Sequence, residues 1–360
     1  MGRIRIDYLD DLKMLAIFGI ILIHVAILWP DAQIQGHNLS VFFSVIGRFG
    51  VPVFLMITGA LFLGRGIPSI PQFYKNRIIR VILPYILWIL VFTLLTFYIW
   101  KISDINIGTV RLFLDTFLNN IGWYTWMIIG VILAIPFINE FIIHRKFEEV
   151  KYWIIIIIFA SIFYQICIFF NQTTFLDLRF FCGPLAYILL GYYFSRKEFN
   201  ISPNKMILIC LVLFILMTVL KNKEVLSTNI THMIVNTMDM KLTSHLDLSP
   251  IQLVQSVSIF LLFKNIHAST KGFGLKIKKF LKLKPIRSFI LSTSKSSYGM
   301  YLAHITVLVL IPMFFRALQF TGSQTFFVVI ILSILTFLIT WIAVLILGKI
   351  PVLDKFSGYH

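Results

Sequence analysis

Long runs without a charged residue recur along the chain, separated by short segments that hold most of the Lys and Arg. A helix needs about 20 mainly apolar residues to cross a bilayer, with about 17 as the lower limit. The shorter runs reach this length when flanking residues are included. The pattern predicts an all-α, polytopic membrane protein with about ten transmembrane helices, over residues 14–30, 49–64, 81–100, 116–139, 152–175, 180–195, 206–220, 248–263, 296–315 and 317–348.

Segments rich in Lys and Arg alternate with segments that are poor in them. This alternation predicts the orientation of the chain in the membrane. Residues 31–40 hold no Lys or Arg, whereas the segment before the ninth expected span holds Lys271, Lys276, Lys278, Lys279, Lys282, Lys284 and Arg287. Because basic loops stay in the cytoplasm, both termini are predicted to be cytoplasmic. The last basic segment could also attract anionic lipid headgroups or a polyphosphate ligand, although topology alone explains it.

The composition excludes an ordinary soluble protein. Hydrophobic residues make up 59%, charged residues 13%, and the mean hydropathy is +0.90. The basic cytoplasmic loops explain much of the net charge of +17, so no nucleic-acid partner is expected. Cys167, Cys182 and Cys210 show no paired spacing, and we expect no metal site. Residues 1–360 are expected to form a single integral-membrane domain.

Three ionisable residues share one face of the first expected helix. Lys13 and His24 are eleven positions apart, which on a helix brings them to nearly the same face, roughly 16 Å apart along the axis. Asp10 falls close to the same stripe, one turn before Lys13. Ionisable groups within a membrane are unfavourable and usually functional, so this stripe is a candidate site.

Two further groups of basic residues have two interpretations each. Arg77 and Arg80 lie one turn apart before the third span, where they either anchor the helix at the cytoplasmic surface or bind phosphate through two guanidinium forks. Arg48 lies within a span. Its guanidinium either extends to the outer edge of the membrane or faces the interior of the helix bundle.

The ninth expected span carries a second polar face. Ser297, Tyr301 and His304 are spaced i, i+4 and i+7 and so share one side of a helix. A lone His in such a helix is more often a hydrogen-bonded packing residue than a functional one. Its place beside Tyr301 nevertheless makes His304 a candidate.

Several segments, in this order, resemble motifs of the acyltransferase 3 family of bacterial membrane O-acyltransferases. They are Leu9-Asp10-x-Leu12-Lys13 with His24, Gly47-Arg48-Phe49-Gly50-Val51-Pro52 through Gly59, Arg77-x-x-Arg80 before Pro84, Trp123-Tyr124, Leu189-Leu190-Gly191-Tyr192-Tyr193, and Ser296-Ser297-Tyr298-Gly299-Met300-Tyr301-Leu302-Ala303-His304. The resemblance spans essentially the whole chain. It is closest to the stand-alone sugar O-acetyltransferases, which lack an additional extracytoplasmic domain.

The resemblance implies a multi-pass enzyme of the bacterial cytoplasmic membrane with ten core helices. Acetyl-CoA would be the acyl donor, and a hydroxyl of a cell-envelope glycan or lipid-linked sugar would be the acceptor. The residue that matches the family's catalytic His is His24, supported by the basic residue at Lys13. Arg77 and Arg80 match the two arginines on the acyl-CoA side of the site.

Acyl transfer needs a base for the acceptor hydroxyl and donors for the developing oxyanion. A His in an apolar helix stays uncharged, which suits a base, so we expect His24 to take this proton or to carry the acyl group transiently. Asp10 and Lys13 would orient the cytoplasmic end of the site. Arg48 or Tyr301 would hold the carbonyl oxygen.

Two positions depart from the family pattern. Lys13 stands where the family usually has Arg, which keeps the charge but loses the bidentate fork. Ile121 stands where the family often has a His before the Trp of the fourth helix. A transporter that relays protons along the Asp10–Lys13–His24 stripe is the main alternative, although no inverted repeat is evident. A homologue without turnover is the third possibility.

Overall fold

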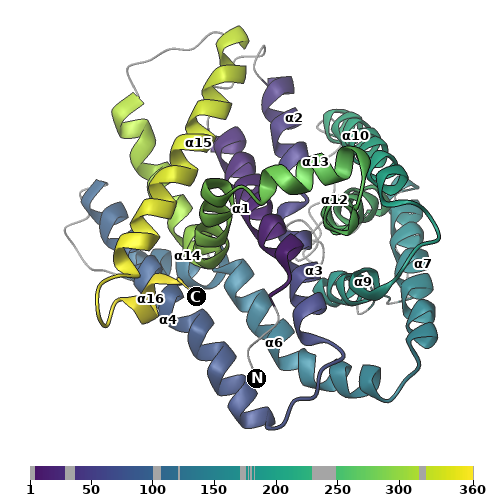
Figure 1. Cartoon of the computed structure of the whole chain (residues 1–360). Coiled ribbons are helices and arrows are strands. Elements are labelled where there is room, and N and C mark those ends of the chain that lie inside the picture. The colour runs from purple at the N-terminus through teal and green to yellow at the C-terminus, as the bar shows by residue number, and fades with distance from the viewer. Residues whose placement is uncertain are drawn as a thin grey trace.

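A computed structural model describes residues 5–28, 37–99, 107–120, 122–170, 176, 178, 181, 183–228, 249–315 and 322–359. The helices are α1 (Asp7–Leu28), α2 (His37–Gly47), α3 (Gly50–Phe62), α4 (Ile70–Ile99), α5 (Ile107–Asp115), α6 (Trp123–Ile143), α7 (Val150–Phe169), α9 (Pro184–Arg196), α10 (Pro203–Thr228), α12 (Pro250–Ala268), α13 (Gly272–Leu281), α14 (Lys284–Phe315), α15 (Gly322–Leu347) and α16 (Asp354–Ser357). These ranges contain no β-strand (Figure 1). The predicted all-α fold is confirmed.

Among the described residues, six stretches are helical, long and apolar enough to cross a membrane: Leu39–Phe62, Ile70–Ile99, Trp123–Ile143, Phe147–Cys167, Pro203–Lys223 and Phe326–Leu347. A membrane-type fold is therefore supported, whereas the expected count of about ten spans is not confirmed. The other four expected spans correspond to α1, α9, α12 and α14. Two of them depart from a simple span, since α9 has only 13 residues and the first turns of α1 carry Asp10, Asp11 and Lys13.

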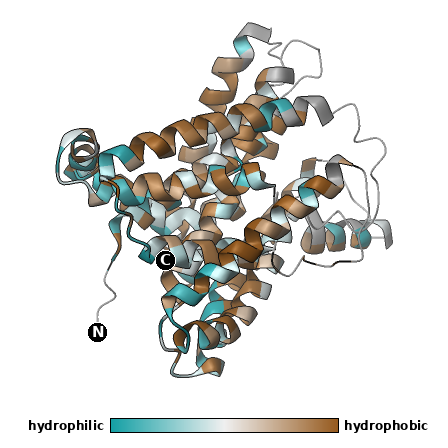
Figure 2. Cartoon of the chain, turned by 90° about the vertical axis from the view of Figure 1, so that its right-hand side faces the viewer, coloured by the Kyte–Doolittle hydropathy of each residue, from teal (hydrophilic) through white to brown (hydrophobic). Residues whose placement is uncertain are grey.

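Helix α1, whose first turns carry charged residues, lies inside the bundle, whereas α4, α7 and α10 lie on its outside. Helix α1 contacts α2, α3, α12, α14 and α15. Helices α4, α7 and α10 leave large apolar side chains such as Leu94, Phe159 and Leu208 exposed, and brown, the colour of hydrophobic residues, predominates along the helices in Figure 2. The hydrocarbon of a membrane solvates such apolar side chains well. Polar residues are unfavourable there and are found where neighbouring helices shield them from the lipid.

Glycines allow two helix pairs to approach closely. A Cβ added to Gly59 of α3 would lie 1.9 Å from the carbonyl oxygen of Ile188 in α9. A Cβ added to Gly47 would lie 2.3 Å from the carbonyl oxygen of Gly19 in α1. Small residues at such contacts are the usual means of packing helices within a membrane.

Hydrophilic residues gather at the side of the bundle where both labelled ends of the chain lie (Figure 2). Near these ends, Arg5 and Tyr359 interact electrostatically, and the indole nitrogen of Trp88 donates to the carbonyl oxygen of Ser357 at 3.3 Å. Both ends therefore lie at one side of the bundle, as the distribution of Lys and Arg requires. That this side is cytoplasmic stays a prediction.

Candidate functional site

Helices α1 and α14 run side by side in the same direction and meet at two levels. Near their starts, the hydroxyl of Ser294 donates to the carboxylate of Asp10 at 2.6 Å. Further along both helices, the rings of His24 and His304 pack with their centroids 5.0 Å apart. Fourteen helical residues rise about 21 Å, so the two levels are separate sites rather than one.

The level further along the two helices, called the upper level below, is a pair of imidazoles, one from each helix. His304 is 1% exposed, and its Nδ1 forms a hydrogen bond with the backbone oxygen of Tyr301. A carbonyl oxygen only accepts hydrogen bonds, so Nδ1 carries the proton of the neutral ring and Nε2 keeps its lone pair. This buried Nε2 has no hydrogen-bond partner within the described part of the chain. His24, which lies beside it, is half-buried.

Tyrosines surround this pair. The ring of Tyr301 lies 5.5 Å from that of His304 and 4.6 Å from that of Tyr124, at the start of α6. One turn below Tyr301, the hydroxyl of Tyr298 donates to the carbonyl oxygen of Val81 in α4 at 2.8 Å. Helices α1, α4, α6 and α14 thus converge on a group of two imidazoles and several phenols, of which His304, Tyr124 and Tyr301 are buried. The pair His24 and His304, with Tyr124 and Tyr301, is called the His–Tyr site below.

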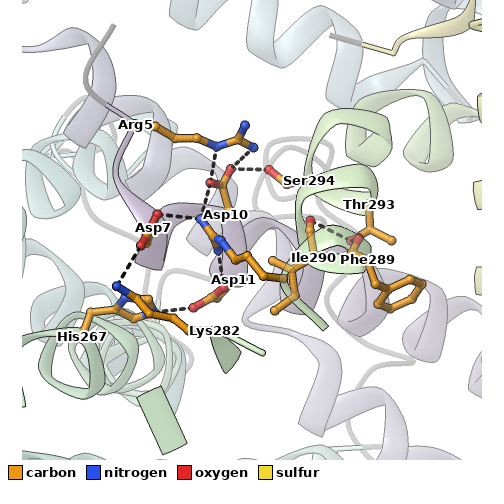
Figure 3. Close-up of polar contacts among 11 residues, drawn as sticks. Arg5, Asp7, Asp10, Asp11, His267, Lys282, Phe289, Ile290, Thr293 and Ser294 are labelled. Carbon is orange, nitrogen blue, oxygen red and sulfur yellow. Dashed lines mark hydrogen bonds and ion pairs between the residues drawn. The ribbon is translucent and has the colours of Figure 1, made fainter. Parts of the chain in front are cut away.

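The lower level is a carboxylate cluster formed by Asp7, Asp10 and Asp11 of α1 (Figure 3). Arg287 of α14 binds all three, at 2.7 Å from Asp7 and 3.2 Å from each of the other two. Asp10 also accepts from Arg5 at 2.7 Å. Asp11 is fully buried and pairs with His267 at the end of α12.

The charge of Asp10 is stabilised within this cluster. Burial acts to raise the pKa of Asp10, but hydrogen bonds from Arg5 and Ser294 outweigh it, and the pKa lies below its ordinary value. A carboxylate with these partners is poorly placed to exchange protons with a substrate. Its role is to hold the beginning of α1 against α14.

The structure distributes the remaining predicted site residues over three places. Lys13 is half-buried and interacts electrostatically with Asp10, as its position one turn away predicts. Arg77 stacks its guanidinium on the ring of Phe62, 4.4 Å from the centroid, and Arg80 is exposed on the same helix. These arginines therefore lie just before Val81, which accepts the hydroxyl of Tyr298.

Arg48 lies in the break between α2 and α3. It is half-buried, and the adjacent Gly47 packs against Gly19 and Ile23 of α1, the residue before His24. Of the predicted residues, the structure brings together His24, Tyr301 and His304 at one level and Asp10 and Lys13 at the other. Ile121 lies outside the described residues.

Some residues of the two levels were not foreseen as site residues. Arg287 was assigned to the basic segment before α14, yet it neutralises the carboxylate cluster. His267 and Ser294 carried no motif, and only the helix packing brings them to Asp11 and Asp10. Tyr124 belongs to the Trp123-Tyr124 pair noted in the sequence. Within the described ranges, no three His, Cys, Asp or Glu residues are grouped as a metal site would need.

Comparison with known families gives one match, the acyltransferase domain of the acyltransferase 3 type, over residues 6–345. No curated protein and no solved structure matches the chain. The matched region contains both the His–Tyr site and the carboxylate cluster. The chain therefore belongs to the acyltransferase 3 family of membrane proteins, which transfer an acyl group to a hydroxyl-bearing acceptor.

Proposed function

We propose that this protein transfers an acetyl group from cytoplasmic acetyl-CoA to a hydroxyl of a cell-envelope glycan or lipid-linked sugar, in the cytoplasmic membrane of a bacterium. The observation that carries the proposal is the His–Tyr site, in which His24 and His304 pack 5.0 Å apart beside a buried tyrosine. The site offers a proton acceptor and hydroxyl donors in one place, which are the groups that acyl transfer needs.

In the proposed reaction, the acceptor hydroxyl gives its proton to His24 while its oxygen attacks the thioester carbonyl. The carbon–sulfur bond then breaks, and the coenzyme A thiolate leaves with the proton from the imidazole. The products are the acetyl ester and free coenzyme A. Two cationic rings at this separation would repel one another, which disfavours protonation of both imidazoles at once.

The negative charge that develops on the carbonyl oxygen needs fixed donors. Tyr301 and Tyr124 are buried residues of this site, and their hydroxyls would donate to that oxygen without reorganising water. We assign the main oxyanion contact to Tyr301, since it packs against both His304 and Tyr124. Arg48 remains the second candidate for this contact.

The donor would bind where α4 begins. Guanidinium forks bind phosphate bidentately, and Arg77 and Arg80 present two of them on successive turns. The contact between Tyr298 and Val81 joins this end of α4 to the helix of the His–Tyr site. The carboxylate cluster with Lys13 then acts indirectly, since it fixes the register of α1 against α14 and so the placement of His24.

The test is acetyl-CoA binding and free-thiol release by the detergent-purified protein, compared with His24→Ala and Arg80→Ala. Arg145→Ala serves as a matched control, because Arg145 is another exposed arginine and lies beyond the end of α6. We expect Arg80→Ala to lose binding, His24→Ala to bind without turnover, and Arg145→Ala to behave as the wild type. Absence of acetyl-CoA binding by folded wild-type protein would overturn the proposal, and proton-coupled glycan flux would then favour transport.

A further inference from the structure

Helix α13 crosses one end of the bundle between two longer helices. It follows α12 and precedes α14, and in Figure 1, which looks almost along the axis of α12, it runs across the view. It lies at the side of the bundle where the carboxylate cluster is, because Lys282 at its end is 3.5 Å from Asp7. On the orientation predicted from the distribution of Lys and Arg, this level is the cytoplasmic surface of the membrane.

One face of α13 is fixed to the bundle. The backbone nitrogen of Gly274 donates to the side-chain oxygen of Asn204 at 2.9 Å, and the amide of Asn204 donates to the carbonyl oxygen of Lys271 at 2.9 Å. Lys278 donates to the carbonyl oxygen of Ser269 at 3.3 Å. Gly274 is buried. These contacts determine which face of α13 remains open.

The open face combines apolar and basic side chains. Phe273 is 61% exposed and Phe280 58% exposed, and Leu283, just beyond the helix end, is 51% exposed. Lys276 and Lys279 of α13 are exposed among them, and so is Lys284, the first residue of α14. No acidic residue in the described part of the chain forms an ion pair with these three lysines. Water is a poor environment for this set of aromatic rings.

We propose that α13 is an interfacial helix that binds anionic phospholipids of the cytoplasmic leaflet. Phe273, Phe280 and Leu283 enter the boundary between headgroups and acyl chains, and the three lysines bind lipid phosphates. Apolar and basic residues on one exposed helix face are the pattern of helices that lie in this interface. A soluble polyphosphate would match the lysines but would leave the aromatic rings in water.

The proposal does not depend on acyl transfer, because its test detects only the contact between α13 and lipid. The full-length protein, with benzoylphenylalanine in place of Phe280, is placed in nanodiscs of phosphatidylcholine with or without phosphatidylglycerol and irradiated. Mass spectrometry then identifies what is bound. We expect a phospholipid adduct enriched in phosphatidylglycerol. A covalent dimer in its place, or no lipid adduct, would overturn the proposal.

A second measurement isolates the lysines. We expect phosphatidylglycerol to raise the unfolding temperature of the wild type in nanodiscs, and Lys276→Gln/Lys279→Gln/Lys284→Gln to lose most of that increase. The matched control replaces three exposed lysines elsewhere, Lys146, Lys205 and Lys349, by Gln and should keep it. Equal loss in both triple variants would contradict a specific role of α13.

Discussion

The imidazoles of His24 and His304 pack with their centroids 5.0 Å apart, although they belong to the first helix and to one near the end of the chain. Their alignment follows from the parallel course of α1 and α14, which the pairing of Asp10 with Ser294 and Arg287 fixes near the helix starts. A pair of packed imidazoles, one of them buried with its tautomer set by a backbone carbonyl, is suited to proton transfer.

We expect His304→Asn to lower the turnover of acetyl-CoA by up to about 10²–10⁴-fold, the range for loss of general acid–base catalysis, because His24 loses its neighbouring imidazole. Asn retains a donor near the position of Nδ1, so the hydrogen bond to the backbone oxygen of Tyr301 is kept while Nε2 is lost. Acetyl-CoA binding should be unchanged. Full turnover in a variant with normal thermal stability would remove His304 from the reaction.

Tyr301→Phe removes a hydroxyl from the His–Tyr site without removing the ring. If this hydroxyl stabilises the oxyanion, turnover should fall by about 10²–10³-fold with little change in KM for acetyl-CoA. Tyr298→Phe is the control, because the hydroxyl of Tyr298 bonds to the backbone of Val81. It should affect thermal stability more than turnover, and equal turnover losses in the two variants would argue against the assigned role of Tyr301.

The sequence predicted the helical membrane fold because apolar runs of spanning length are a strong and local signal. The number of spans was less predictable. Helices inside a bundle tolerate charge when neighbours neutralise it, as α1 does with its carboxylate cluster. The charged turns of such helices resemble helices of soluble proteins in composition. Hydropathy alone therefore separates membrane-spanning helices of this kind poorly from helices that lie at the membrane surface.

The site was predicted in part for a similar reason. The spacing of Tyr301 and His304 placed both on one helix face, but their approach to His24 depends on how α14 packs against α1. Asp10 was expected to serve the same site as His24. Helical rise places it about 21 Å away, where Arg287 neutralises it. Long-range ion pairs of this kind have no signature in sequence spacing.

Arg287→Ala should strongly destabilise the protein, because it leaves Asp10 and Asp11 buried without their shared cation. Removing one partner of a buried ion pair typically lowers the free energy of unfolding by about 3–5 kcal/mol. We expect the lower end, since Asp7 is 38% exposed and contributes less. Thermal unfolding in detergent measures the loss. Arg287→Lys should recover part of it, and an unchanged unfolding temperature in Arg287→Ala would contradict the assigned role.

The carboxylate cluster also predicts a dependence of stability on pH. Because the pKa of Asp10 is lower in the folded protein than its ordinary value of 3.8, the unfolded chain binds the proton more tightly. The stabilisation is therefore fully present above pH 3.8 and is lost as the pH falls through the folded value. Unfolding temperatures measured between neutral and acid pH should fall less steeply in Asp10→Asn. Identical slopes in the two proteins would be inconsistent with this linkage.

Gly59→Ala and Gly191→Ala should each separate α3 from α9. The added Cβ would lie 1.9 Å from the carbonyl oxygen of Ile188 in the first case and 2.0 Å from that of Met56 in the second. Backbone atoms cannot rotate away as a side chain does, so the helices must move apart, with a loss of about 1–3 kcal/mol or more. Gly130→Ala in α6 is the matched control, because nothing lies within 4 Å of its added Cβ. It should unfold at or slightly above the wild-type temperature, since Ala favours helix over Gly by about 1 kcal/mol. If all three variants unfolded alike, the close contact of α3 and α9 would not contribute to the stability of the bundle.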